Sequence, residues 1–217
     1  MNVVFDLDGT LIDSAPDIQN MAGSLLSRLG HAPLSLAETR RFIGEGSAVF
    51  VQRMMIARNI RYSEEAFESL HSEFLELYQW SVDKAALYSG ADDAMQTLLE
   101  QGHRLGLCTN KPAAATQAVL EHMHLTPFFS AVIAGGMLPS RKPDPAMLHE
   151  TITRLGDGPS LFVGDSEIDA ETAQRATVPF ALFSEGYRKI EVEDIHHDWC
   201  FSDFQTLPNI VEQLARG

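Results

Sequence analysis

Two aspartates, Asp6 and Asp8, stand two positions apart after a short apolar run near the start of the chain. Residues two apart on an extended chain face the same side, so the two carboxylates would lie together. Carboxylates held in this way repel, and one of them stays protonated unless a cation intervenes. One could act as a nucleophile, and the other as a general acid and then a general base. The alternative is a solvated Asp-x-Asp-Gly turn, in which Gly9 permits the tight bend.

A second acidic pair, Asp165 and Asp169, follows an apolar run late in the chain. Mg²⁺ in proteins is usually held by one or two carboxylates together with water and phosphate oxygens. If the Asp165 loop lies beside Asp6 and Asp8, the sequence predicts a Mg²⁺ site built from these four residues. The alternative is structural, because acidic residues also stabilise the N-terminus of a helix.

Positive charge for an anionic ligand is scarce in this sequence. The lysines are Lys84, Lys111, Lys142 and Lys189. Lys142 could act as a point charge on a phosphate, although an ordinary surface lysine is the alternative. Thr109 and Asn110 follow another apolar run and offer a hydroxyl and an amide, which could bind phosphate oxygens or cap the next helix. We therefore predict that Thr109, Asn110 and Lys142 bind phosphate.

The apolar runs before these polar groups resemble strands of one parallel sheet. The first run, residues 3–5, is β-branched and too short for a helix, so we predict a buried strand. After Gly90, helical and strand-like segments alternate, which is typical of a parallel sheet covered on both faces. The further strands expected are 104–108, 131–134, 160–163, 180–183 and 199–201, and the helices are 91–101, 113–123, 145–155, 169–176 and 207–214. In such sheets ligands bind at the carboxyl ends of the strands.

Between the first strand and the rest of the sheet lies a segment with helical periodicity and no convincing strand. Ser14 is a plausible N-cap for a first helix that stops near Gly30. Further helices are predicted over residues 47–59 and 63–84. We therefore predict an α/β catalytic core of residues 1–12 and 88–217, with an inserted all-helical domain of residues 13–87.

The composition narrows the class of protein. The 217 residues are 45% hydrophobic, which is enough to bury a core. The formal net charge of −14 argues against a nucleic-acid binder. It also means that an anionic substrate needs local positive charge from a metal, a lysine or helix N-termini. Cys108 and Cys200 form no CxxC pair, so we expect each to pack as a small apolar side chain.

Neither a signal peptide nor a membrane span is predicted. The first residues carry no basic run and reach an acidic residue at position 6. No apolar run approaches the roughly 20 residues that a membrane span needs. We expect a cytoplasmic protein that is monomeric or homodimeric and that binds neither a membrane nor nucleic acid.

Four segments, taken in order, resemble the motifs of the haloacid dehalogenase-like superfamily and, within it, of the phosphoglycolate phosphatase-like group. They are residues 4–14 (VFDLDGTLIDS), 107–111 (LCTNK), 142–145 (KPDP) and 163–169 (VGDSEID). The resemblance extends over essentially the whole chain, and the helical insertion is similar to the family's small cap domain. It implies a Rossmann-like parallel sheet with helices on both faces, plus an inserted all-helical cap.

The resemblance also implies a role for each matching residue. Asp6 would attack phosphorus and carry an aspartyl phosphate. Asp8 would protonate the leaving oxygen and then activate the hydrolytic water. Thr109 and Lys142 would bind the phosphoryl group. The groups implied for Mg²⁺ are Asp6, the main-chain carbonyl of Asp8, and Asp165, with Asp169 in support either directly or through water.

Substrate choice is expected to lie in the cap. The loop over residues 42–46 is similar to the glycine-containing loop that phosphoglycolate phosphatases lower over their site, and Gly44 and Gly46 would allow a close backbone approach. Arg40 and Arg41 precede this loop, and either could meet a substrate carboxylate, with Arg41 as the predicted contact. The alternative is that both arginines are solvated. We also expect the loop to close over bound substrate.

The predicted function is Mg²⁺-dependent hydrolysis of a small phosphorylated metabolite, with 2-phosphoglycolate as the expected substrate. Dehalogenases of the superfamily lack the second aspartate, Asp8, and phosphonate-cleaving relatives use a cap lysine, of which only Lys84 is present here. The alternatives are a phosphatase for a sugar phosphate, nucleotide or pyrophosphate, a sugar-phosphate mutase, and a receiver module that acts by binding. One departure from the family pattern is Thr177 in place of a frequent glycine, which should alter a turn without affecting catalysis.

Overall fold

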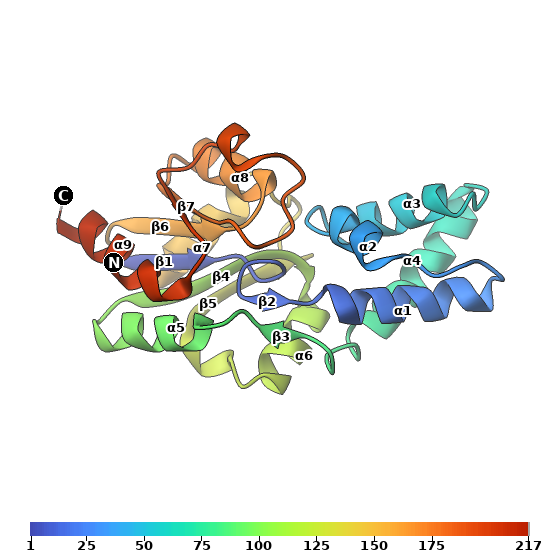
Figure 1. Cartoon of the computed structure of the whole chain (residues 1–217), viewed down its shortest axis with the longest axis horizontal. Helices are drawn as coiled ribbons and strands as arrows, with labels where there is room; N and C mark the ends of the chain where they lie inside the picture. Colours follow the sequence, from blue (N-terminus) through green and yellow to red (C-terminus); the bar gives the residue numbers. More distant parts are fainter. Residues whose placement is uncertain (217) are drawn as a thin grey trace.

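The computed structural model describes residues 1–216 and places a sheet at one end of the molecule and a group of helices at the other (Figure 1). Six strands form the main sheet in the order β5-β4-β1-β6-β7-β8, and every neighbouring pair is parallel. The strands are β1 (Asn2–Phe5), β4 (Arg104–Pro112), β5 (Phe129–Gly135), β6 (Ser160–Gly164), β7 (Phe180–Phe183) and β8 (Trp199–Phe201). The α/β fold class predicted from the sequence is therefore confirmed.

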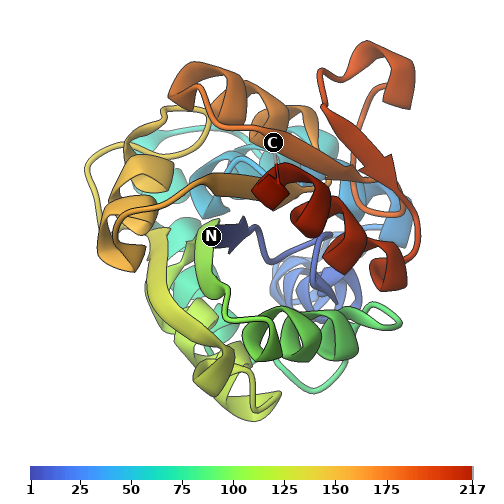
Figure 2. The same ribbon diagram turned by 90° about the vertical axis from the view of Figure 1, so that its left-hand side faces the viewer.

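Helices cover both faces of this sheet, as Figure 2 shows from the end of the molecule. Successive side chains of a strand point to opposite faces, and in β1 Val3 and Phe5 join one hydrophobic cluster while Val4 joins another. The first cluster lies under α5 (Ala91–Glu100), α6 (Ala113–His122) and α9 (Leu207–Arg216), and the second under α7 (Ala146–Leu155) and α8 (Glu167–Ala176). Short 3-10 helices span Thr126–Phe128, Val192–Asp194 and Phe204–Thr206.

The two cysteines differ in their environment. Cys108 is fully buried in the cluster under α7 and α8, as predicted. Cys200 is exposed, because it lies on β8 at the edge of the sheet. The prediction that both pack as buried apolar side chains is therefore wrong for Cys200.

The helices at the other end form a third hydrophobic cluster, mostly from their own side chains. They are α1 (Ala15–Arg28), α2 (Leu36–Phe42), α3 (Ser47–Ala57) and α4 (Glu64–Tyr78), together called the cap below. The predicted helix over residues 63–84 is shorter in the structure and ends at Tyr78. Beyond it the chain turns back toward the core. On the way, the main-chain N–H groups of Lys84 and Ala85 donate to the buried carboxylate of Asp17 on α1, at 2.9 Å and 2.7 Å.

Two short strands join the cap to the core. β2 (Ile12–Asp13) and β3 (Ala86–Leu87) pair antiparallel, so the two crossings of the chain run side by side. The sequence analysis found no strand in this region, because two residues are too few to show an alternating pattern. Within residues 1–216, no helix has both the length and the apolar character needed to cross a membrane.

Candidate active site

Three polar residues come together because β1 lies between β4 and β6. The last residue of β1 is level with Leu107 in β4 and with Val163 in β6. The main-chain N–H of Asp6 donates to the carbonyl of Val163 at 2.9 Å. Asp6 and Asp165 directly follow β1 and β6, and Thr109 lies two residues beyond Leu107 in the longer β4, so the three residues lie at the same edge of the sheet. β4 and β5 extend the sheet on one side of β1, and β6, β7 and β8 extend it on the other. Open α/β sheets bind ligands at such a switch point.

Asp6, Asp165 and Asp169 form a buried acidic group whose carboxylate oxygens lie within 4.8 Å of one another. Within residues 1–216, one cation forms ion pairs with this group. The ammonium of Lys142, a residue only 2% exposed, lies 2.7 Å from Asp169 Oδ1 and 2.9 Å from Asp6 Oδ1. One ammonium does not balance three carboxylates, so the group needs further positive charge when all three are ionised.

Burial and mutual repulsion set the protonation of this group. Burial raises the pKa of Asp6 from 3.8 to about 6, although the Lys142 ammonium opposes the rise. Burial also raises the pKa of Asp165 well above its usual range, and the Asp169 and Asp6 charges add to the effect. Burial alone lowers the pKa of Lys142, but Asp169 and Asp6 outweigh it and raise that pKa, so Lys142 stays charged. A bound divalent cation would favour the ionised carboxylates instead.

The free oxygens of Asp6 and Asp165 fit a hard divalent cation. Asp6 Oδ1 accepts no hydrogen bond within residues 1–216, because the Lys142 ammonium approaches it outside hydrogen-bond geometry. Asp165 accepts bonds from the Thr10 hydroxyl at 2.8 Å and the Tyr187 main-chain N–H at 2.6 Å. These two donors, which the sequence analysis missed, use one bond at each Asp165 oxygen and leave lone pairs on both. Oxygen donors of this kind are those that Mg²⁺ prefers.

Asp169 has fewer free lone pairs for a metal than Asp6 and Asp165. Its Oδ1 accepts from the Lys142 ammonium, and its Oδ2 accepts from the Ser166 hydroxyl at 2.6 Å and main-chain N–H at 3.2 Å. These bonds hold Asp169 at the start of α8 and fix Lys142 beside Asp6. Asp169 therefore orients the Lys142 ammonium. This role does not depend on a contact between Asp169 and a metal.

The Asp8 carboxylate lies outside the acidic group and faces the cap. Its Oδ1 accepts the Ser14 hydroxyl at 2.5 Å and the Lys111 ammonium at 3.0 Å. Ser14 is the N-cap residue of α1, as predicted, but its hydroxyl bonds Asp8 and makes no side-chain cap to the helix. The same ammonium donates to the hydroxyl of Tyr78, the last residue of α4, at 2.9 Å. The sequence analysis gave Lys111 no role, although its place three residues after the predicted strand 104–108 was a usable signal.

Asn110 ties the core to the cap loop. Its side-chain amide donates to the carbonyls of Gly44 at 2.9 Å and Lys142 at 3.0 Å, and its oxygen accepts the main-chain N–H of Lys142 at 2.9 Å. Both amide hydrogens are therefore used. The predicted phosphate contact of Asn110 would have to come from its main chain, because the side chain is a bridge between the two loops.

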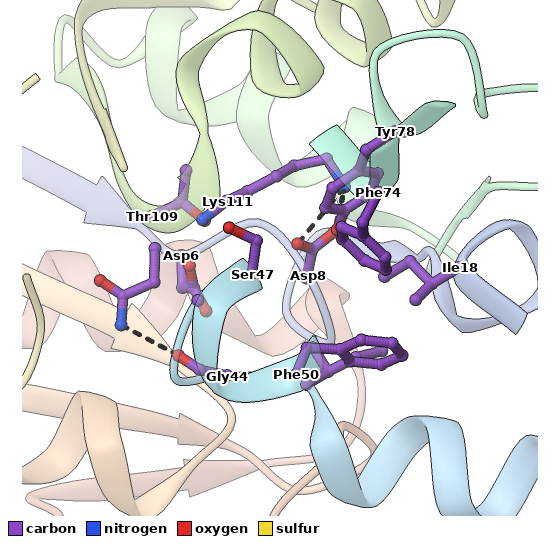
Figure 3. A pocket seen from close by; sticks show the side chains of 13 residues that line it. Asp6, Asp8, Ile18, Gly44, Ser47, Phe50, Phe74, Tyr78, Thr109 and Lys111 are labelled. Carbon is purple, nitrogen blue, oxygen red and sulfur yellow. Dashed lines mark hydrogen bonds and ion pairs between the residues drawn. The ribbon is translucent and has the colours of Figure 1, made fainter. Parts of the chain in front are cut away.

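A small cavity lies between the cap and the carboxyl edge of the sheet (Figure 3). Its volume of about 30 Å³ has room for about two water molecules. The core lines it with Asp6, Asp8, Thr109, Asn110 and Lys111, and the cap with Ile18, Ile43, Gly44, Gly46, Ser47, Phe50, Phe74 and Tyr78. Polar groups thus form the core side and mostly apolar groups the cap side, which strengthens electrostatic interactions inside by excluding water.

The cap loop approaches the site through its glycines, but the cap arginines do not. Gly46 has φ +89°, a backbone conformation that other residues rarely adopt. It lies against the carbonyl of Asn110. Arg40 donates to Asp13 at 2.8 Å. Arg41 is exposed and lines a separate surface pocket. Arg41 is not among the residues that line the cavity between cap and core, so the predicted substrate contact has no support in this arrangement.

Comparisons with known proteins agree with this arrangement. The chain is 44% identical to the phosphoglycolate phosphatase of Cereibacter sphaeroides over 98% of both chains, and 40% identical to that of Rhodobacter capsulatus over 97% of this chain and 96% of the other. The crystal structure of a predicted phosphoglycolate phosphatase from Haemophilus somnus superposes with a TM-score of 0.90 at 29% identity and 96% coverage of each chain. Residues 3–183 match the family model described as haloacid dehalogenase-like hydrolase, and the chain belongs to that family.

Proposed function

We propose that this protein is a Mg²⁺-dependent phosphatase that hydrolyses 2-phosphoglycolate through an aspartyl phosphate on Asp6. The observation that carries the proposal is the position of Asp6, which lies at the floor of the cavity with an oxygen that accepts no hydrogen bond and with the Lys142 ammonium 2.9 Å away. The names of the relatives at 40–44% identity over nearly the whole chain support the choice of substrate.

In the first step a carboxylate oxygen of Asp6 attacks phosphorus, and the bond from phosphorus to the ester oxygen breaks. Asp8 gives its proton to that leaving oxygen, so the product departs as an alcohol. Lys142 and Thr109 hold the phosphoryl oxygens while this happens. Phosphoryl transfer depends mainly on such positioning and charge neutralisation.

In the second step water attacks the phosphorus of the aspartyl phosphate. Asp8, now a carboxylate, takes a proton from that water. The bond between Asp6 and phosphorus breaks, inorganic phosphate leaves, and Asp6 is regenerated. Asp8 suits both steps because the Lys111 ammonium and the Ser14 hydroxyl hold it at the border between the cavity and the cap.

Asp6 and Asp165 would hold Mg²⁺, with the main-chain carbonyl of Asp8 as a further ligand and Asp169 in support. The bound cation would neutralise phosphate charge, which the net charge of −14 otherwise opposes. The same cation would keep Asp6 ionised below pH 6 as well, where burial otherwise favours its protonated form.

The cap would exclude water from the site and limit the size of the leaving group. We assign residues 13–87 to this cap domain and the remainder to the catalytic core. The cap side chains that line the cavity, among them Ile18, Phe50 and Phe74, are bulky and apolar, and they would restrict the leaving group to a small one such as glycolate. The cap has to open to admit substrate, because the cavity between cap and core has room for only about two water molecules.

Phosphate release from a panel of compounds tests the proposal. The panel contains 2-phosphoglycolate, sugar phosphates, nucleotides and pyrophosphate, each measured with Mg²⁺ and with a chelator. We expect Mg²⁺-dependent turnover that is greatest for 2-phosphoglycolate. In Asp6→Asn it should fall by at least roughly 10³-fold, whereas the exposed control Asp157→Asn should retain it. Full activity of Asp6→Asn would exclude the aspartyl-phosphate mechanism.

A further inference from the structure

Lys111, a residue of the core, supplies positive charge to the part of the cavity beside Asp8 and Tyr78. Among the thirteen residues that line the cavity it is the one cation, beside the two carboxylates Asp6 and Asp8. It is only 6% exposed. Figure 3 shows its side chain reaching toward Asp8 and Tyr78, away from Asp6. Phosphate therefore belongs with Lys142 on the Asp6 side, and Lys111 is left for another part of the substrate.

The hydrogen bonds of Lys111 leave one donor available. An ammonium carries three N–H groups. One is directed at Asp8, whose oxygens lie 3.0 and 3.4 Å away, and one at the Tyr78 hydroxyl at 2.9 Å. The Tyr78 ring lies 4.2 Å from the ammonium and adds a cation–π contact that fixes its position. The third N–H can therefore bond a ligand without breaking either existing contact.

The connectivity of 2-phosphoglycolate places its carboxylate at this position. The carboxylate is separated from the ester oxygen by a single methylene group, and the ester oxygen has to meet Asp8. The carboxylate must then lie within reach of groups that contact Asp8, and Lys111 is such a group at 3.0 Å. The cap arginines offer no substitute, because Arg40 pairs with Asp13 and Arg41 lies on the surface.

We propose that Lys111 binds the substrate carboxylate and makes the enzyme prefer phosphomonoesters that carry a carboxylate one methylene group from the ester oxygen. The inference rests on the proposed phosphatase function and assigns the specificity of that site to a residue of the second motif. Tyr78 and Asp8 act as positioning residues for the ammonium. Specificity then depends on the cap through Tyr78 and not through the arginines that precede the glycine loop.

The test compares 2-phosphoglycolate with 2-hydroxyethyl phosphate, which has a neutral hydroxymethyl group in place of the carboxylate. We expect the wild-type enzyme to prefer 2-phosphoglycolate. Lys111→Met should lower kcat/KM for 2-phosphoglycolate on the order of 100-fold, chiefly through KM, since it removes a buried charge partner. For 2-hydroxyethyl phosphate the loss should stay below about 10-fold. Lys84→Met, which removes an exposed lysine, is the matched control and should behave as wild type.

Two outcomes would overturn the inference. Equal losses on both compounds, mainly in kcat, would mean that Lys111 acts only through Asp8. Equal kcat/KM of the wild-type enzyme for 2-phosphoglycolate and 2-hydroxyethyl phosphate would mean that the enzyme does not recognise the carboxylate. If Lys111→Met does not fold, Lys111→Gln gives the same comparison with a polar side chain. Failure of the proposed function is distinguishable, since the wild-type enzyme would then release phosphate from neither compound.

Discussion

Replacing Asp6 with asparagine should stabilise the metal-free protein at pH 8 and leave its stability nearly unchanged at pH 4. The folded protein holds a proton on Asp6 up to about pH 6, whereas an ordinary aspartate loses it near pH 3.8. The folded state thus binds more protons than the unfolded state between these values, and the free energy of unfolding falls as pH rises through them. Asparagine resembles the protonated aspartate and does not titrate.

The size of the effect follows from the separation of the two pKa values. A separation of about 2 pH units corresponds to about 3 kcal/mol of unfolding free energy. For a protein of this length that is a rise in Tm of about 6 to 12 °C. Mg²⁺ should reverse the order of the two proteins, because it binds and stabilises the folded wild type while Asp6→Asn has lost a ligand.

Urea unfolding at pH 4 and pH 8, with chelator and with Mg²⁺, measures these quantities. The exposed Asp157→Asn serves as the control for the change in net charge. The reasoning would be refuted if Asp6→Asn were no more stable than Asp157→Asn at pH 8 with chelator. It would also be refuted if the gain were as large at pH 4 as at pH 8, because the buried charge is absent at pH 4.

Two further predictions concern the cap and a helix end. The Lys189 ammonium lies 3.0 Å from Glu45 of the cap loop, so Lys189→Gln should favour the open cap and raise KM by about 2- to 5-fold, as expected for a partly exposed ion pair. The KM values of variant and wild type should converge in about 1 M NaCl, where such pairs are screened, and a ratio independent of salt would contradict this account. Thr177 ends α8 with φ +56°, so Thr177→Gly should raise the unfolding free energy by about 1 kcal/mol. Asn59→Gly, at φ +52°, should gain less because asparagine tolerates this conformation, and equal gains in urea unfolding would show that backbone strain is not the cause.

The sheet was predictable because its strands are apolar runs and most of them alternate with helices that have their own apolar periodicity. The parts that the sequence missed are those without such a pattern. β2 and β3 have two residues each, and they pair only because the chain crosses twice between cap and core. The end of α4 was placed too late because the helical pattern gives no sign that Asp17, on a different helix, accepts the N–H groups of residues 84 and 85.

For the site, the strand-end position predicted the meeting of Asp6, Thr109 and Asp165, because parallel neighbours expose their carboxyl ends at one edge. It did not predict which polar side chains contact one another within the site. Lys111 is 103 positions from Asp8 and 33 from Tyr78. Contacts over such separations are set by how the cap docks on the core, which no local pattern records.

The misplacement of Arg41 shows the same limit within one short helix. Proximity to the glycine loop favoured Arg41 as a substrate contact, yet the direction of a helical side chain depends on its angle around the helix axis. Thr39 is fully buried and sets the inward face of α2. Each residue turns about 100° further, so Arg41 lies about 200° from Thr39 and points to solvent. An inward arginine can be told from an outward one only when the buried face of its helix is known. The seven residues of α2 are too few for an apolar pattern to reveal that face. The cation that the cavity needs therefore comes from a strand end of the core, where Lys111 is held by contacts from both domains.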